Sequence, residues 1–194
     1  MSQTIYLMRH GQTLFNSQHR IQGWSDSPLT EKGVNQAKIA SQYFPENQIK
    51  LESAYCSTLE RTEDTLLQIT DLPYKRLKGL KEWNYGVFEA ESDYLYPFNN
   101  DANFFPLFGG ESDLDVQKRM STTIKDIVTQ DHSSNILIVS HGGAIRSFAR
   151  AWRKYEANSN YLPYENCCVL KFIYENDVFS FQNMYNHDFS SLES

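Results

Sequence analysis

The chain has 194 residues, of which 40% are hydrophobic and 22% are charged, as in soluble globular proteins that bury a full core without disulfides. The net charge of −6 argues against broad binding to nucleic acid or to anionic lipid, so an anionic ligand would need a local cluster of cations. No apolar run approaches bilayer length and the amino terminus lacks a signal-peptide pattern, so we expect a cytoplasmic, single-domain protein over residues 1–194.

The first predicted strand ends in residues that are suited to binding phosphate. The apolar residues 5–8 stop at Arg9, His10 and Gly11. A buried strand can hold Arg9 and His10 at its carboxyl end, where open α/β sheets place their ligand crevices. Because Gly11 has no side chain, we expect backbone N–H groups to approach an anion there. Arg9 would neutralise phosphate charge, and His10 would attack phosphorus.

The next stretch predicts a loop, a helix and a strand. Residues 12–26 are polar and irregular, and they are expected to wrap around the pocket. Thr30 is the predicted N-cap of a helix whose apolar stripe continues until Pro45 ends it. Residues 53–57 form a short predicted strand.

A second predicted helix brings another cation to the same region. Ser57 or Thr58 is expected to cap this helix, which extends over about residues 59–70. Arg61 falls in its first turn, where the amino terminus of a helix already favours anions. The sequence therefore places a second arginine close to the end of a strand.

The middle of the chain is predicted to contain a strand, a long excursion and a helix. The strand covers residues 73–83 and carries Glu82 at its end. Residues 87–110 are aromatic, acidic and rich in turn residues, and we expect them to cover the substrate, because long loops in compact domains are usually functional. A helix with a regular apolar face follows over about residues 111–130.

The remaining segments complete an α/β pattern. Residues 135–139 read as a buried strand that stops at His141, and a helix follows over about residues 144–155. Two further strands are predicted as a hairpin that adds to the sheet edge, and residues 188–194 as a loose tail. Alternating strands and helices predict a layered α/β fold with a mainly parallel sheet and right-handed crossovers.

Polar side chains follow four of the predicted strands at their carboxyl ends: Arg9 with His10, Arg61, Glu82 and His141. In a parallel sheet these ends lie along one edge, so groups far apart in the sequence can surround one ligand. Arginine matches the geometry of phosphate, a neutral imidazole is a nucleophile, and a carboxyl group can protonate a leaving alkoxide. This set predicts phosphoryl transfer through a phosphohistidine on His10, although Glu82 alone would also suit a simple ion pair.

The three cysteines, Cys56, Cys167 and Cys168, do not form a disulfide pattern and are expected to be reduced. Cys56 precedes Arg61, as in the loop of cysteine-dependent phosphatases, but the spacing is one residue too short for that motif. We therefore expect Cys56 to be a core residue of its strand.

Six ordered motifs carry a family resemblance: LMRHGQTLFN at 7–16, RIQGWSDSPLTEKGVNQA at 20–37, CSTLERTEDT at 56–65, KEWNYGVFEA at 81–90, GGES at 109–112 and VSHGGAIR at 139–146. With these motifs the chain resembles the phosphoglycerate mutase-like branch of the histidine phosphatase superfamily. The resemblance implies a three-layer αβα fold and catalysis by His10 without a metal or another cofactor. It also implies a set of ligand-binding residues, with Glu82 as the proton donor: Arg9, Asn16, Arg61 and His141 on the phosphoryl group, and Gln22, Gly23 and the Gly142 amide nearby.

The resemblance does not distinguish a phosphatase activity from a mutase activity. A mutase must hold a doubly anionic substrate at both ends, whereas no Lys or Arg occurs in residues 83–117. The excursion offers aromatic residues instead, which favours a phosphomonoester with an apolar or uncharged body: Phe88, Tyr94, Tyr96, Phe98, Phe104, Phe105 and Phe108. The prediction is therefore a phosphatase of small-molecule phosphomonoesters, with a mutase and a non-catalytic binding module as alternatives, and a homodimer is left open.

Overall fold

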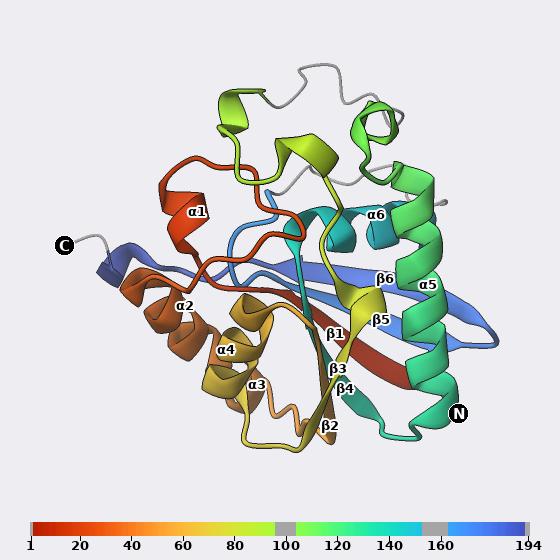
Figure 1. Cartoon of the computed structure of the whole chain (residues 1–194). Coiled ribbons are helices and arrows are strands. Elements are labelled where there is room, and N and C mark those ends of the chain that lie inside the picture. Colours follow the sequence, from red (N-terminus) through yellow and green to blue (C-terminus); the bar gives the residue numbers. More distant parts are fainter. Residues whose placement is uncertain (1, 96–103, 153–162, 193–194) are drawn as a thin grey trace.

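The computed structural model describes residues 2–95, 104–152 and 163–192 (Figure 1). A six-stranded sheet with the order β3-β2-β4-β1-β5-β6 forms its centre. The strands are β1 (Gln3–Arg9), β2 (Ser53–Ser57), β3 (Tyr74–Leu77), β4 (Asn135–Ser140), β5 (Val169–Glu175) and β6 (Val178–Tyr185). The pairs β3–β2, β2–β4 and β4–β1 are parallel, and the hairpin β5–β6 joins β1 in antiparallel orientation. The predicted mainly parallel sheet and the hairpin at its edge are confirmed.

Helices cover both faces of this sheet, which gives the predicted three layers (Figure 1). Side chains of a strand alternate between the two faces. In β1, Tyr6 and Met8 pack with the helices α2 to α4, whereas Ile5 and Leu7 pack with α5 and α6. The helices are α1 (Leu14–Ser17), α2 (Glu31–Ser41), α3 (Tyr43–Glu46), α4 (Glu60–Ile69), α5 (Asp113–Gln130) and α6 (Gly142–Trp152).

The ends of the early helices differ in part from the prediction. The Thr30 side chain accepts a hydrogen bond from the Gly33 N–H at 3.0 Å, so this N-cap is confirmed. The predicted end at Pro45 is wrong, because α2 ends at Ser41 and Pro45 lies inside the short helix α3. Proline is tolerated there because the N–H groups of a first helical turn have no partner within the helix.

The predicted cap of α4 is also wrong. Its N-cap is Leu59, which makes no side-chain cap, and the Ser57 hydroxyl accepts a hydrogen bond from the Leu59 N–H at 3.1 Å instead. Arg61 is the second residue of α4 and therefore lies in its first turn, as predicted.

The strand predicted over residues 73–83 is much shorter in the structure. β3 ends at Leu77, and a 3₁₀ turn, η1 (Lys78–Leu80), follows it. Gly79 in this turn packs closely against α5, since an added Cβ would lie 1.8 Å from the Thr123 hydroxyl oxygen. Glu82 is consequently reached by an irregular segment and not by a strand.

The described parts of the excursion form 3₁₀ turns beyond the carboxyl edge of the sheet (Figure 1). They are η2 (Gly86–Phe88), η3 (Asp93–Leu95) and η4 (Phe105–Phe108), and Tyr96 and Phe98 lie outside the described residues. Near the carboxyl terminus, η5 (Ser190–Leu192) gives the predicted loose tail one ordered turn. Within the described ranges, no helix combines the length and the apolarity that are needed to cross a bilayer.

Candidate active site

His10 follows the last residue of β1 and is almost completely buried, with 3% of its surface exposed. Its Nδ1 lies 2.7 Å from the Gly11 carbonyl oxygen. Since a carbonyl oxygen can only accept, Nδ1 carries the proton and Nε2 keeps its lone pair. Burial and the nearby Arg61 and Arg9 hold the pKa of His10 well below its usual value. The ring is therefore neutral at pH 7 and can act as a nucleophile through Nε2.

The N–H group of Gly11 does not face an anion-binding site, contrary to the expectation from its missing side chain. Its N–H donates to the Thr65 hydroxyl at 3.0 Å, so it is not available to an anion. An added Cβ on Gly11 would lie 2.4 Å from the carbonyl oxygen of Gly33 in α2. The glycine therefore allows α2 to pack directly against the segment that follows His10.

Arg61 has no exposed surface, and a loop holds its guanidinium group. Nη1 donates to the Ser25 carbonyl at 3.0 Å and to Asp26 at 2.8 Å, and Nη2 donates to the Gly23 carbonyl at 2.8 Å. Nε is buried and has no hydrogen-bond partner among the described residues. One edge of the guanidinium group is thus fixed by protein, and the Nε edge is left for a bidentate ligand such as phosphate.

The guanidinium group of Arg9, like that of Arg61, is bonded to protein at a terminal nitrogen and, within the described ranges, unpaired at Nε. Its Nη1 donates to the Tyr164 carbonyl, while its buried Nε has no partner in the part of the chain that the structure describes. The side chain lies against the start of α6, since a Cβ added to Gly142 would be 3.2 Å from Nε. In both arginines the Nε group is therefore buried and unpaired among the described residues.

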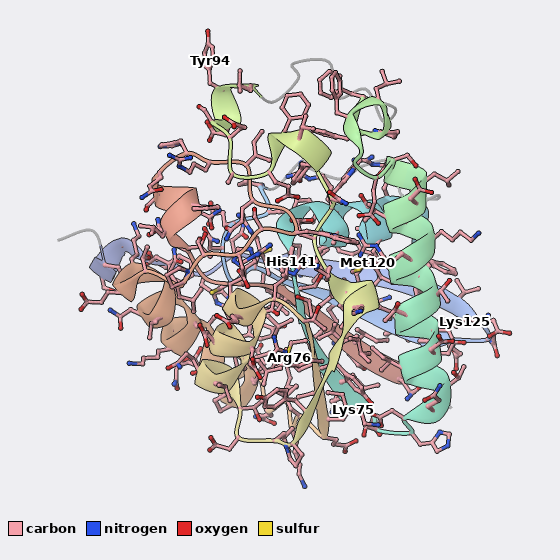
Figure 2. The ribbon with its side chains drawn as sticks, viewed as in Figure 1. Lys75, Arg76, Tyr94, Met120, Lys125 and His141 are labelled. Atoms are coloured by element: carbon pink, nitrogen blue, oxygen red, sulfur yellow. The ribbon has the colours of Figure 1, made fainter. Side chains whose placement is uncertain are left out.

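His141 follows β4 and is fully buried near the centre of the molecule, below the 3₁₀ turns of the excursion (Figure 2). Its ring centroid lies 5.3 Å from that of His10. Its Nε2 is 2.7 Å from the Ser57 hydroxyl, and its buried Nδ1 has no partner among the described residues. Burial, Arg61 and His10 hold the pKa of His141 well below its usual value.

Glu82 lies beside these groups although no strand carries it. Its Oε2 accepts from the Gly143 N–H at 2.9 Å, and its Oε1 accepts from the N–H groups of Ala144 and Trp83, each at 2.7 Å. Gly143 and Ala144 belong to the first turn of α6, where the helix dipole favours a carboxylate. The backbone thus fixes the orientation of the Glu82 carboxylate, and one of its donors, Gly143, is two residues after His141 in the chain.

The loop after β1 positions two more of the predicted residues. Asn16 Oδ1 accepts from the Thr13 N–H at 3.2 Å and from the Asn166 amide at 3.3 Å, which leaves its own NH₂ group as a donor. Gln22 accepts from the Thr13 hydroxyl at 2.6 Å and donates to Ser27 at 2.9 Å. Thr13 is fully buried, so it shapes this loop.

Glu89 supports the site and was missed in the sequence. Its two carboxylate oxygens accept hydrogen bonds from the backbone N–H groups of residues 23–25 at 2.8 to 3.1 Å, and from the Ser25 hydroxyl at 2.6 Å. Carbonyl groups of the same segment hold Arg61. Glu89 was read only as one of several acidic residues of the excursion, and no sequence spacing indicates that it contacts a loop more than sixty positions earlier.

The described aromatic residues of the excursion form a cluster, but not all of them form a rim. Phe88, Phe104 and Phe108 have ring centroids 5.0 to 5.4 Å apart, and Phe108 is partly exposed. Phe105 is only 3% exposed and belongs to the core, so its expected place on the rim is wrong. Tyr94 is 80% exposed and points away from the body of the molecule (Figure 2).

The three cysteines are free and buried, as predicted. Burial raises the pKa of the Cys56 thiol to about 12, which keeps it protonated and unreactive at neutral pH. Cys56 is fully buried in β2, so it is a core residue of its strand, as predicted.

A profile of the histidine phosphatase superfamily (branch 1) matches residues 5–187. The chain belongs to the histidine phosphatase superfamily. The match begins within β1, before His10, and ends after the hairpin β5–β6, so superfamily membership applies to nearly the whole chain.

The proteins that this chain is similar to include mutases and, by fold, a phosphatase. A probable phosphoglycerate mutase, GpmB, from Yersinia pestis (strain Pestoides F) is 34% identical over 153 residues, which cover 73% of this chain and 70% of that protein. The crystal structure of phosphoglycerate mutase from Bacillus anthracis str. Sterne has 25% identity and a TM-score of 0.80, covering 94% of this chain and 92% of the other. A mycobacterial glucosyl-3-phosphoglycerate phosphatase shares the fold, with 24% identity and a TM-score of 0.77, covering 96% of this chain and 100% of the other.

Proposed function

We propose that this superfamily member hydrolyses phosphomonoesters through a phosphohistidine on His10. The observation that carries the proposal is the state of the His10 ring. Its proton is held on Nδ1 by the Gly11 carbonyl, which leaves the Nε2 lone pair as the nucleophile. The free Nε edges of Arg9 and Arg61 supply the cations that a transferred phosphoryl group requires.

The proposed reaction has two steps. In the first, Nε2 of His10 bonds to phosphorus while the ester P–O bond breaks, and Glu82, which takes up a proton when the substrate anion binds beside it, gives that proton to the leaving alkoxide. In the second, Glu82 takes a proton from water, which attacks phosphorus and breaks the P–N bond to release phosphate. Arg9, Arg61, His141 and the NH₂ group of Asn16 would donate to the phosphoryl oxygens, and loss of one such donor costs about 3 kcal/mol of transition-state stabilisation.

Two features favour a phosphatase over a mutase. No Lys or Arg occurs in residues 83–117 to hold a second anionic group, and the described excursion contributes the aromatic cluster of Phe88, Phe104 and Phe108. Such a surface suits a substrate with an apolar or uncharged body. The likeness to GpmB favours the second candidate, a phosphoglycerate mutase.

The nucleophile is tested by replacing His10. We expect His10→Ala to lower phosphomonoester hydrolysis by at least about 1,000-fold and to abolish acid-labile phosphoenzyme, because no other group can form the intermediate. His19→Ala is the matched control, since the His19 side chain is 81% exposed and should leave both readouts unchanged. A non-catalytic binding module would show neither turnover nor phosphoenzyme even in the wild-type protein, and that result would reject the proposal.

The choice between phosphatase and mutase rests on a comparison of rates. Phosphate release from an aryl phosphate and from 3-phosphoglycerate is measured beside mutase turnover after priming with bisphosphoglycerate. We expect release from the aryl phosphate to be fastest. Primed mutase turnover that exceeds hydrolysis would replace this assignment with the mutase.

A further inference from the structure

Arg119, a residue of α5, lies against the irregular segment that carries Glu82. Its Nη1 donates to the carbonyl groups of Gly79 and Lys81 at 3.0 and 2.7 Å, and its Nη2 donates to the carbonyl group of Glu82 at 3.2 Å. Nε and Nη2 donate to the two carboxylate oxygens of Glu111, each at 2.8 Å. The direction of these hydrogen bonds is fixed, because a guanidinium group only donates and carbonyl and carboxylate oxygens only accept. All five N–H groups of Arg119 are thus bonded to protein.

Glu111, which precedes α5, extends these contacts to the residues after Glu82. Its Oε2 also accepts from the Asn84 N–H at 2.9 Å, and its own N–H donates to the Asn84 carbonyl at 2.9 Å. Its carbonyl group accepts from the Trp83 indole N–H. Arg119 and Glu111 together therefore bind the backbone on both sides of Glu82.

No strand or helix supplies these contacts instead. β3 ends at Leu77 and η1 ends at Leu80, so the backbone that leads to Glu82 has no neighbouring strand. The Arg119 and Glu111 side chains are each only 18% exposed, so water competes little for their hydrogen bonds. Hydrogen bonds from a charged donor are also stronger than neutral ones. The guanidinium group therefore takes the place of a strand partner for this segment.

The two ends of Glu82 are bound to different helices. Its carboxylate accepts from Gly143 and Ala144 at the start of α6. Its carbonyl group accepts from Arg119 of α5 and from the Trp24 indole N–H at 2.8 Å. A carboxyl group that delivers a proton must lie within hydrogen-bond reach of the leaving oxygen, and a misplacement of about 1 Å can cost about 100-fold in rate. The contacts at the backbone end therefore bear on the position of the carboxyl group.

We propose that Arg119 is a positioning residue that holds the Glu82 carboxyl group in place for proton transfer to the leaving alkoxide. The proposal rests on the proposed function, because it concerns the proton donor of that reaction. Arg119 does not bind the ligand itself, since protein groups occupy all its donors. Its loss should therefore slow proton transfer and leave the binding of the phosphoryl group by Arg9 and Arg61 unchanged.

The test compares two phosphomonoesters of similar size by kcat/KM, which reports the reaction through transfer of the phosphoryl group to His10. Benzyl phosphate releases a strongly basic alkoxide that needs a proton, whereas 4-nitrophenyl phosphate releases a weakly basic phenolate that does not. We expect Arg119→Lys to lower kcat/KM about 30- to 100-fold for benzyl phosphate and less than about 3-fold for 4-nitrophenyl phosphate. The reason is that lysine keeps the charge but not the five directed donors.

Two further measurements complete this comparison. The affinity of Arg119→Lys for inorganic phosphate should equal that of the wild-type protein. Lys118→Gln removes an exposed cation from the neighbouring position of α5 and is the matched control, which should change neither substrate. Equal losses on both substrates in Arg119→Lys, or no loss on benzyl phosphate, would overturn the proposal.

Glu82→Gln shows whether the effect passes through this carboxyl group. We expect it to cause the same selective loss, and we expect Arg119→Lys to lower benzyl phosphate hydrolysis no further when it is added to Glu82→Gln, because residues that act as a unit are not additive. A further selective loss in the double variant would contradict the proposal. A selective loss in Glu82→Gln beside wild-type rates in Arg119→Lys would reject the positioning role alone. Absence of phosphoenzyme in the wild-type protein, or an unchanged substrate ratio in Glu82→Gln, would reject the proposed function and this inference with it.

Glu111→Gln guards against misfolding of Arg119→Lys. Glutamine keeps the size of the side chain but offers one acceptor oxygen where the carboxylate offers two. We expect a selective loss on benzyl phosphate in this variant as well, smaller than that of Arg119→Lys. A wild-type substrate ratio in Glu111→Gln would count against the proposal even if Arg119→Lys did not fold.

Discussion

The hydrogen-bond acceptors around Arg61 determine which edge of its guanidinium group stays unpaired. The Ser25 and Gly23 carbonyls occupy the terminal nitrogens of Arg61, and the Nε edge is left free. Such fixed donors are effective because they need no reorganisation when charge develops on the transferred group. The geometry of Arg61 depends on Glu89, whose carboxylate holds the loop that supplies those carbonyls.

Replacing Glu89 tests this dependence. Glu89→Ala leaves the N–H groups of residues 23–25 without their acceptor, so we expect the free energy of unfolding to fall by about 1 to 3 kcal/mol. Because Arg61 loses its fixed carbonyl partners, kcat/KM for a phosphomonoester should fall at least about 10-fold. Urea denaturation and steady-state kinetics measure the two effects, with the exposed Glu91→Ala as control. Wild-type kinetics in folded Glu89→Ala would show that Arg61 is held without the loop.

Among the elements, α2 packs through a contact that its hydrophobic pattern does not indicate. Gly33 lies in the first turn of α2, and an added Cβ there would lie 2.0 Å from the Gln12 carbonyl oxygen. Gly11 faces the same helix from the other side of the contact. Two glycines thus allow a helix to approach the segment that carries His10, although glycine is otherwise unfavourable inside a helix.

Replacing Gly33 with alanine should therefore destabilise the protein. Alanine has the higher helix propensity, but its methyl group would overlap backbone atoms, and we expect a net loss of about 1 to 3 kcal/mol or more in the free energy of unfolding. The urea midpoint of Gly33→Ala is compared with that of Lys38→Ala, an exposed position on the same helix. An unchanged or higher midpoint for Gly33→Ala would contradict the close approach.

The whole molecule has a net charge of −6, yet its candidate site gathers cations and buried imidazoles. The site is therefore a local exception to the charge of the chain, and its cations oppose protonation of the two histidines. Burial and the arginines hold the pKa values of His10 and His141 well below the usual 6.5. This arrangement couples the chemistry of the site to the stability of the fold.

The coupling predicts a pH dependence of stability. Below pH 6.5 and above the lowered folded-state pKa values, the unfolded chain binds protons that the folded chain does not bind. The free energy of unfolding should consequently fall as the pH falls through this window, by up to about 1.4 kcal/mol per pH unit for each histidine. Urea denaturation from pH 7.5 to 5 in phosphate-free buffer measures the slope. His10→Ala and His141→Ala should each reduce it, and slopes identical to that of the wild-type protein would refute the linkage.

The sequence by itself determined the order of the main strands and helices, the parallel sheet with its edge hairpin, and the polar residues that follow the strands, whereas the short helices α1 and α3 lie where a loop and the end of α2 were predicted. These features are local, because hydrophobic periodicity and turn residues act over a few positions. The predicted roles of Arg9, His10, Arg61, Glu82 and His141 stay predictions, although each of these residues lies in the candidate site. Nucleophile and proton donor therefore await the kinetic experiments.

Only the tertiary structure decided how those side chains are held. It showed that β3 is short and that Glu82 rests on the first turn of α6, that Gly11 serves helix packing, and that Glu89 fixes the loop around Arg61. Such contacts join residues far apart in the chain, and their formation depends on how layers pack, which no local pattern specifies. Sequence patterns thus indicated which groups reach the sheet edge. Packing and hydrogen bonding set the tautomer and charge of the histidines and the unpaired edges of the arginine guanidinium groups.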